Sequence, residues 1–150
     1  VHIIGGDLFG ESRKKLLKDR IAELKLEDAF TFHGQVNNVR DFLNELEILV
    51  CASHEEAFPI SILEAMAFNL PIVSTAVNGI PEAIVHGQCG ILVKERDCME
   101  LASGIERVIV ELDEAKAMGK AARQRAAETF GLEEFFRKIN CLYLDVQERK

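Results

Sequence analysis

Two glutamates, Glu56 and Glu64, are the side chains of this sequence whose type and spacing most directly indicate chemistry. They flank a junction between a short apolar run and an apolar helical pattern, in the stretch "EEAFPISILEAMA". A helix start there would expose the backbone N–H groups of Ile60, Ser61 and Ile62 at the positive end of the helix dipole, where an anion such as a diphosphate binds. Carboxylates on either side accept hydrogen bonds from hydroxyl groups. The junction is therefore a candidate site for a sugar joined to a nucleoside diphosphate.

A purely structural explanation accounts for the same residues. The run "SILE" has the S-x-x-E pattern of a capping box, in which Ser61 would begin the helix and Glu64 would bond back to the backbone of Ser61. Pro59 would fix the direction of the chain before the helix, and Glu56 would be a solvated loop carboxylate. From the residues alone, the binding site and the helix cap both stay open.

The glycine-rich segment "GGDLFG" and the histidine His54 are weaker candidates. The glycines match neither the G-x-G-x-x-G spacing of a dinucleotide site nor the G-x-x-x-x-G-K-[ST] pattern, which favours a turn that lets a ligand approach the backbone. His54 beside Glu55 could relay protons, but no G-x-S-x-G pattern accompanies the pair, which favours an ordinary loop histidine. No D-x-D pair of carboxylates occurs, so we predict neither a metal site nor a cofactor.

The composition is that of one soluble α/β domain. The chain has 150 residues, of which 48% are hydrophobic and 29% are charged, and this length is enough to bury a core. A net charge of −7 argues against a nucleic-acid partner. The four cysteines are irregularly spaced, which predicts reduced, mostly buried thiols. No apolar run approaches the roughly 20 residues of a membrane span and no signal peptide is seen, so we predict a cytoplasmic protein without a transmembrane segment.

Short apolar runs alternate with helical patterns along the whole chain. Strands are predicted over 1–4, 30–34, 47–53, 71–77 and 90–93, and helices over 12–25, 39–46, 61–68, 97–112, 114–128 and 133–148. This order predicts one α/β domain with a doubly wound, Rossmann-like parallel sheet and helices on both faces. Ligands of such sheets bind beyond the C-terminal ends of the strands, which is where Glu56 lies.

Two helices carry clear apolar stripes. In the helix predicted over 12–25, one face is expected to be buried. In the helix predicted over 97–112, Asp97 and Glu100 are expected to form a capping-box pair ahead of a buried face. The predicted buried faces consist of Leu16, Leu17, Ile21 and Leu24 in the first of these helices, and of Leu101, Ile105, Val108 and Leu112 in the second.

The central segment "EEAFPISILEAMAFNLPIVSTAVNGIPEAIVHGQCGILV" resembles the signature region of the group 1 (family 4) retaining glycosyltransferases, which have the GT-B fold. The matching pattern is a Glu, seven residues and a second Glu, here Glu56 and Glu64, followed in order by "EAMA", "PIV", "GIPE" and "GILV". The resemblance extends upstream to "VHIIGG" and downstream to Tyr143. It implies that residues 1–150 are most of the C-terminal, donor-binding half of such an enzyme. The N-terminal acceptor domain and the first strand–helix unit of this half would then be missing from the chain.

The resemblance also implies roles for individual residues. Glu56, the candidate catalytic residue, would accept hydrogen bonds from hydroxyls of the transferred sugar, and Glu64 would hold the ribose hydroxyls. The backbone of 58–61 would meet the sugar and the distal phosphate, the loop 34–36 would border the base, and Gly5 and Gly6 would lie close to the nucleotide. The implied donor-binding set is Glu56, Phe58, Pro59, Ile60, Ser61, Glu64, Val36 and Gly6.

Several departures from the family pattern bear on these expectations. Pro59 stands where the family often has a glycine, so one backbone N–H is lost. Asn69 replaces a glycine before "PIV", and we expect it to end the helix in left-handed conformation. The Arg and Lys that neutralise the diphosphate in the family lie upstream of this chain, and the basic residues at 13–15 look solvated. We therefore expect the isolated chain to bind a nucleotide-sugar donor weakly and not to turn over.

The resemblance implies a sugar transfer to a hydroxyl acceptor with retention of configuration and without a metal. It also implies two partners, the donor and the missing N-terminal domain, which would be the route to any position at the cytoplasmic membrane surface. A non-catalytic nucleotide-sugar-binding module, or a degenerate glycosyltransferase fragment, is the alternative. A dinucleotide-dependent oxidoreductase is a further alternative, but the chain lacks its fingerprint.

Overall fold

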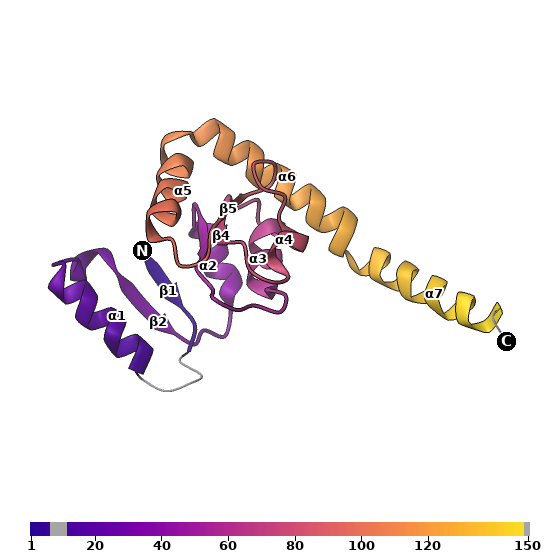
Figure 1. Cartoon of the computed structure of the whole chain (residues 1–150), viewed down its shortest axis with the longest axis horizontal. Coiled ribbons are helices and arrows are strands. Elements are labelled where there is room, and N and C mark those ends of the chain that lie inside the picture. The colour runs from indigo at the N-terminus through magenta and orange to yellow at the C-terminus, as the bar shows by residue number, and fades with distance from the viewer. Residues whose placement is uncertain (7–11, 149–150) are drawn as a thin grey trace. The chain divides into compact units, whose positions relative to one another are not determined.

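The computed structural model describes residues 1–6 and 12–148, and their contacts divide the chain into two compact units, Val1–Phe42 and Leu43–Lys150 (Figure 1). The remaining part of "GGDLFG", from Asp7 to Gly10, lies outside the described residues. The first unit contains β1 (His2–Ile4), α1 (Ser12–Glu23), a 3₁₀ turn (Glu27–Ala29) and β2 (Thr31–Gly34), and α2 (Val39–Glu45) crosses the boundary. The second contains β3 (Leu49–Cys51), α3 (Ile60–Ala67), β4 (Ile72–Thr75), α4 (Ile80–Ala83), β5 (Ile91–Val93), α5 (Cys98–Val110), α6 (Leu112–Phe130) and α7 (Leu132–Glu148).

All five predicted strands are present, and every pairing between them is parallel. In the first unit β1 pairs with β2, and in the second the order is β3-β4-β5. The prediction of a parallel α/β fold is thus confirmed. The described strands nevertheless form two sheets, of two and three strands, where a single sheet was predicted.

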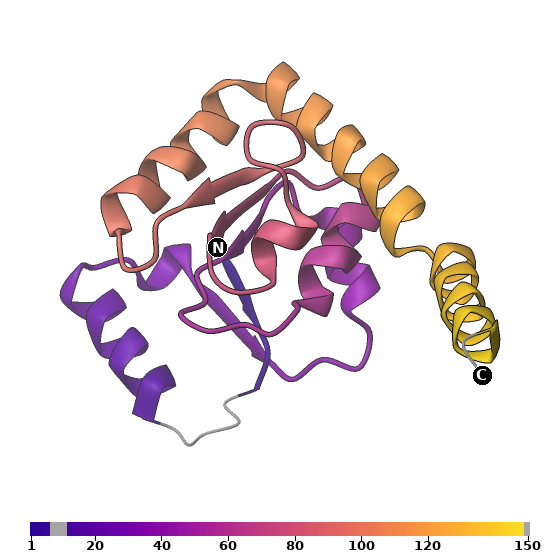
Figure 2. The same cartoon turned by 45° about the vertical axis from the view of Figure 1, so that its right-hand side comes forward.

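The core of the second unit lies around β4, whose four residues are all buried. Val73 of β4 packs against α5 and α6, whereas α3 contacts β3 and β4. Because neighbouring residues of a strand point to opposite faces, this arrangement covers the sheet on both sides, as the apolar run predicts. Figure 2 shows α5 and α6 following one another along this sheet. The cluster under α5 and α6 consists of Val73, Ile91, Val93, Val108, Ala115 and Met118.

The predicted buried face of α5 is largely confirmed. Val108 is buried, and Leu101 and Ile105 pack against the core cluster. Leu112 is the exception, with 59% of its surface exposed, because α5 ends at Val110 and Leu112 opens α6. The change of helix breaks the i, i+3, i+4 spacing on which the prediction rested.

The predicted buried face of α1 is mostly wrong. Only Ile21 is buried, whereas Leu16, Leu17 and Leu24 are exposed. The described first unit holds two strands of three and four residues, which present too little apolar area to cover a helix face of four residues. The basic residues at 13–15 are exposed, as predicted.

Three further findings bear on predictions made from the sequence. All four cysteines are free thiols, but Cys98 and Cys141 are exposed, so the prediction of mostly buried thiols fails for these two. Both lie on helices, where a polar face exposes every side chain on it. Within residues 1–6 and 12–148, no helix combines the length and the apolar character that a bilayer crossing demands. The same residues contain no cluster of three or more His, Cys, Asp or Glu side chains placed to hold a metal ion.

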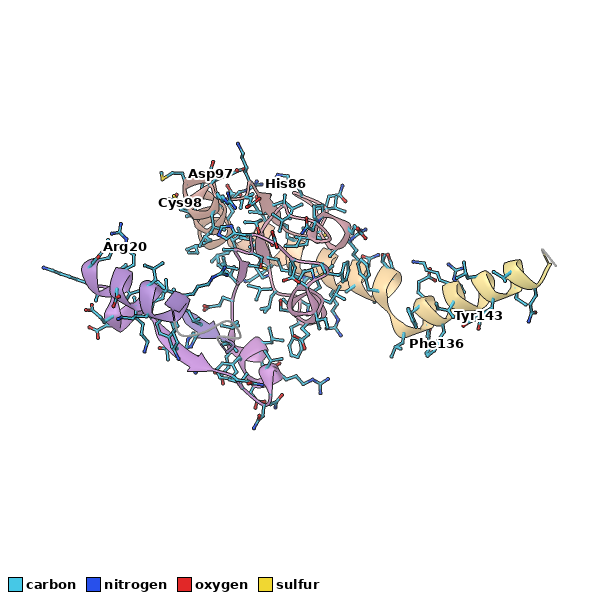
Figure 3. All side chains as sticks on the ribbon, turned by 60° about the horizontal axis from the view of Figure 1, so that its bottom comes forward. Arg20, His86, Asp97, Cys98, Phe136 and Tyr143 are labelled. Carbon is cyan, nitrogen blue, oxygen red and sulfur yellow. The ribbon has the colours of Figure 1, made fainter. Side chains whose placement is uncertain are left out.

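Asp97 begins α5 as predicted, and Figure 3 shows it at the start of that helix beside Cys98. Its Oδ1 accepts hydrogen bonds from the backbone N–H groups of Met99 (3.1 Å) and Glu100 (2.9 Å). The reciprocal half of the capping box is absent, because Glu100 Oε2 accepts from Lys94 N at 2.8 Å instead. The Asp97 carboxylate therefore caps the first turn of α5, and the Glu100 carboxylate, from within the helix, binds the backbone of the turn that precedes it.

We expect Asp97→Ala to lower the free energy of unfolding by about 1 kcal/mol, since two helical N–H groups lose their acceptor. Urea denaturation followed by circular dichroism measures this change. Asp97→Asn is the matched control, because its amide oxygen can accept the same bonds and should leave the midpoint nearly unchanged. An alanine variant with the wild-type midpoint would contradict the assigned cap.

Candidate functional site

The loop that follows β3 carries Glu56 and is held at its base by two hydroxyl groups of β4. Ser74 Oγ donates to the carbonyl of Cys51 at 3.1 Å, and Thr75 Oγ1 donates to the carbonyl of Ser53 at 2.6 Å. These hydroxyls are buried in the core strand, and such groups are stable there only when hydrogen-bonded. They fix the direction in which the loop leaves the sheet.

The turn after β4 lies directly against this loop. The N–H of Gly79 points to the carbonyl oxygen of Glu56 at 3.4 Å. A Cβ atom on Gly79 would lie 2.1 Å from the carbonyl oxygen of Ala57, so only glycine permits this approach. The "GIPE" turn and the Glu56 loop are thereby brought together, although they are separated in the sequence by α3 and β4.

The N-cap of the helix after the loop lies two residues earlier than the capping box predicts, at Pro59 instead of Ser61. Pro59 is the N-cap, with φ −80° and no side-chain capping bond, and α3 starts at Ile60. The carbonyl of Pro59 accepts from Ile62 N at 3.2 Å and from Leu63 N at 3.4 Å. Ser61 is therefore inside the first turn, and Glu64 lies in mid-helix with no cap to complete. The capping-box explanation of Glu64 is wrong, because proline already supplies the extended backbone that an N-cap requires.

The same geometry revises the predicted set of free N–H groups. Ile62 N is bonded to Pro59, whereas no hydrogen bond within the described residues is assigned to the N–H groups of Ile60 and Ser61. Both residues are exposed. Two unpaired donors thus remain at the positive end of α3, where they can hold an anion.

The two carboxylates on either side of this helix start are half-buried. In the part of the chain that the structure describes, neither Glu56 nor Glu64 is assigned a side-chain hydrogen bond or ion pair. Other acidic side chains are satisfied in place, such as Asp97 at its helix start. Partly buried acceptors without a protein partner are suited to bind the hydroxyl groups of a ligand.

His54 lies in the same loop but does not pair with Glu55. Its Nδ1 lies 3.6 Å from Glu95 Oε1 in the turn after β5, and Arg96 Nε lies 3.0 Å from the same oxygen. The His54 side chain is 59% exposed. This placement agrees with the ordinary loop histidine that the sequence favours over a proton relay.

Comparison with known proteins supplies the family. Residues 1–125 match the model of the family described as glycosyl transferases group 1. The chain belongs to this family. It is 32% identical over 126 residues to N-acetyl-alpha-D-glucosaminyl L-malate synthase of Bacillus anthracis, a match that covers 84% of this chain and 33% of that protein.

Solved structures agree with this assignment. Anabaena Alr3699/HepE in complex with UDP is 25% identical, with a TM-score of 0.90 over 96% of this chain and 40% of that one. The same protein in complex with UDP-glucose gives a TM-score of 0.88. These likenesses confirm the Rossmann-like α/β fold of GT-B glycosyltransferases. The chain spans about a third to two fifths of the length of these proteins.

The resemblance to group 1 glycosyltransferases also nominated Gly6 and Val36, which belong to the first unit. Gly5 N donates to the carbonyl of Gly34 at 2.8 Å, and a Cβ on Gly6 would lie 3.7 Å from Cβ of Gln35. Gly5 and Gly34 have positive φ angles of 129° and 67°. The end of β1 and the loop leading to Val36 therefore meet in the described structure.

Two residues that the sequence analysis did not nominate contact the site region of this group 1 glycosyltransferase chain. The ring centroid of Phe130 lies 5.4 Å from that of Phe58, and Phe58 belongs to the loop between Glu56 and α3. Arg125 donates to carbonyls at the end of α4. Both residues belong to α6. Arg125 lies 42 and 43 positions along the chain from the two residues whose carbonyls it bonds. No local spacing in the sequence signals such contacts.

Proposed function

We propose that this chain is the donor-binding half of a retaining, family 4 GT-B glycosyltransferase. The full-length protein would transfer a hexosyl group from a nucleoside diphosphate to a hydroxyl acceptor, without a metal ion. Catalysis belongs to the full-length protein rather than to residues 1–150 alone, because the acceptor domain and the cations for the diphosphate would lie upstream. Free thiols at all four cysteines support a cytoplasmic setting.

One observation carries this proposal. Glu56, before the start of α3, and Glu64, within α3, are partly buried carboxylates with no partner among the described residues, and two N–H groups at the start of α3 are unpaired in the same residues. An anion bound to those donors would have hydroxyl acceptors on both sides, which matches a sugar diphosphate and not a bare phosphate. The likeness to a protein whose structures hold UDP and UDP-glucose supports the same ligand class.

Within this proposal each residue has one role. Glu56 accepts from hydroxyls of the transferred sugar, and Glu64 accepts from the ribose hydroxyls. The N–H groups of Ile60 and Ser61 hold the distal phosphate, while Phe58 and Pro59 contribute backbone contacts to the sugar. In the first unit, the loop ending at Val36 borders the base and Gly6 lies near the nucleotide.

Calorimetric titration of the full-length protein tests the proposal. The panel consists of uridine, guanosine and adenosine diphosphate sugars, together with the corresponding nucleoside diphosphates. We expect the nucleotide sugars of one base to bind with a micromolar dissociation constant and those of the other two bases to bind at least tenfold more weakly. If no member of the panel binds, the proposed function is wrong.

We expect Glu64→Ala to weaken binding of both the nucleotide sugar and the nucleoside diphosphate about tenfold or more, because a hydrogen bond to a charged group contributes roughly 1.5–3 kcal/mol. The two ligands should be affected alike, since both carry the ribose. Glu106→Ala, on the exposed face of α5, is the matched control and should bind as wild type. Undiminished affinity in Glu64→Ala would remove the ribose role.

A further inference from the structure

Arg125 of α6 is bonded to the far end of α4. Its Nε donates to the carbonyl of Ala83 at 2.8 Å, and its Nη2 donates to the carbonyl of Glu82 at 2.7 Å. These are the last carbonyls of a four-residue helix, which the helix itself leaves without donors. The planar guanidinium meets both at once, a geometry that a lysine ammonium cannot reproduce. Arg125 therefore fixes the turn that begins at Gly79.

The same guanidinium also lies against an aromatic pair that reaches the donor loop. The carbon Cζ of Arg125 is 5.9 Å from the ring centroid of Phe130, within the range of a cation–π contact. The ring of Phe130 in turn packs at 5.4 Å and 53° on the ring of Phe58. All three side chains are half-buried. A continuous series of contacts thus runs from the backbone of α4, through the Arg125 and Phe130 side chains of α6, to Phe58 in the loop.

Phe58 sits at the point of that loop where its position matters most. It lies two residues after Glu56 and immediately before Pro59, which begins α3. Its ring also lies close to Gly79, where an added Cβ would lie 3.2 Å from Cδ2 of Phe58. A ring that contacts both Phe130 of α6 and the Gly79 turn limits the movement of the Glu56 carboxylate and of the helix start.

The backbone alone holds these two segments loosely. Among the described residues, one backbone hydrogen bond is assigned between the loop and the turn, from Gly79 N to the Glu56 carbonyl; it is 3.4 Å long, at the weak end of the range. We propose that Arg125 and Phe130 are positioning residues of the donor site. They hold the Glu56 loop and the Gly79–Ala83 segment together, so that Glu56 and the N-terminus of α3 keep a fixed distance from each other. This inference rests on the proposed function.

Variants of α6 separate positioning from ordinary packing. Arg125→Met keeps the length and the apolar stem of the side chain and removes its donors. Phe130→Leu keeps an apolar group and removes the ring, and Phe130→Tyr restores it. Arg123→Met is the matched control, because Arg123 is exposed on the same helix and is assigned no hydrogen bond to either segment in the described structure.

The first measurement is donor affinity and turnover in the full-length protein, with the preferred nucleotide sugar and its nucleoside diphosphate. Arg125→Met and Phe130→Leu are each expected to raise the donor dissociation constant about fivefold, the range expected when one ordinary contact is lost. The loss should be larger for the nucleotide sugar than for the nucleoside diphosphate, because the loop holds the sugar. Phe130→Tyr and Arg123→Met should stay within twofold of wild type. A purely structural role would lower the melting temperature while leaving the folded fraction with wild-type affinity, and that result would overturn the inference.

The second measurement needs no ligand, so it separates this inference from the proposed function. Amide hydrogen exchange should accelerate about tenfold in 54–60 and 79–84 in Arg125→Met, since the contacts that suppress local opening are lost. Exchange in 72–75 should stay as in wild type. If the wild-type protein binds no nucleotide sugar, the proposed function falls, yet faster exchange confined to these two segments still supports the coupling through α6. Unchanged exchange, or equal acceleration throughout the second unit, would refute it.

Discussion

Replacing Glu56 with alanine is expected to lower turnover of the full-length protein about 100-fold or more. The carboxylate is half-buried, is assigned no partner in the described residues, and lies in a loop that Ser74 and Thr75 anchor to β4. If Glu56 has its proposed role, an acceptor held in place in this way would stabilise the reacting sugar without reorganising, and removal of one such preorganised group typically costs two to three orders of magnitude in rate. Steady-state kinetics with the preferred donor measures the loss.

Binding measurements then assign the contact to the sugar. Glu56→Ala should weaken the nucleotide sugar more than the nucleoside diphosphate, because only the former carries the hydroxyls that Glu56 would hold. Glu55→Ala is the matched control, one residue earlier in the same loop with its side chain exposed, and should retain wild-type turnover. Equal losses for both ligands would show that Glu56 does not contact the sugar.

The largest effect on stability is expected at Gly119, where α6 crosses the end of α3. A Cβ on this residue would lie 2.0 Å from the carbonyl oxygen of Asn69. That carbonyl cannot move away easily, because Asn69 N donates to Met66 O and Leu70 N donates to Ala65 O, the two bonds of a Schellman motif.

We therefore expect Gly119→Ala to lower the free energy of unfolding by about 3 kcal/mol, even though alanine is the better helix former by about 1 kcal/mol. Urea denaturation measures this difference. Gly104→Ala in α5 is the comparison and should cost less, because its Cβ would lie 3.0 Å from Val73 Cγ1, an overlap of a few tenths of an ångström with a side chain, whereas the overlap at Gly119 is 1 Å larger and with backbone. If Gly119→Ala proves as stable as wild type, the two helices are not packed as closely as described.

The sequence by itself determined the local features of this protein. The five strands lie where short apolar runs predict them, since alternation and β-branched content act over a few residues. Asn69 takes the left-handed conformation predicted for it, with φ 57°, and Asp97 begins its helix. Each of these outcomes depends on backbone geometry within one turn of chain. The junction at Glu56 was likewise visible, because the end of a buried strand next to a helix start is a local pattern.

Only the tertiary structure showed that the capping-box explanation of the junction fails. Pro59 rather than Ser61 is the N-cap of α3, so Glu64 has no capping bond to make. The exposure of Leu16 and of Cys98 also depended on what surrounds each helix, which periodicity does not report. The contacts of Arg125 with α4 join residues 42 and 43 positions apart, and such pairs arise only when the chain packs. The sequence therefore nominated candidate ligand-binding groups, whereas packing determined which of them have no partner among the described residues and which contacts hold the loop in position.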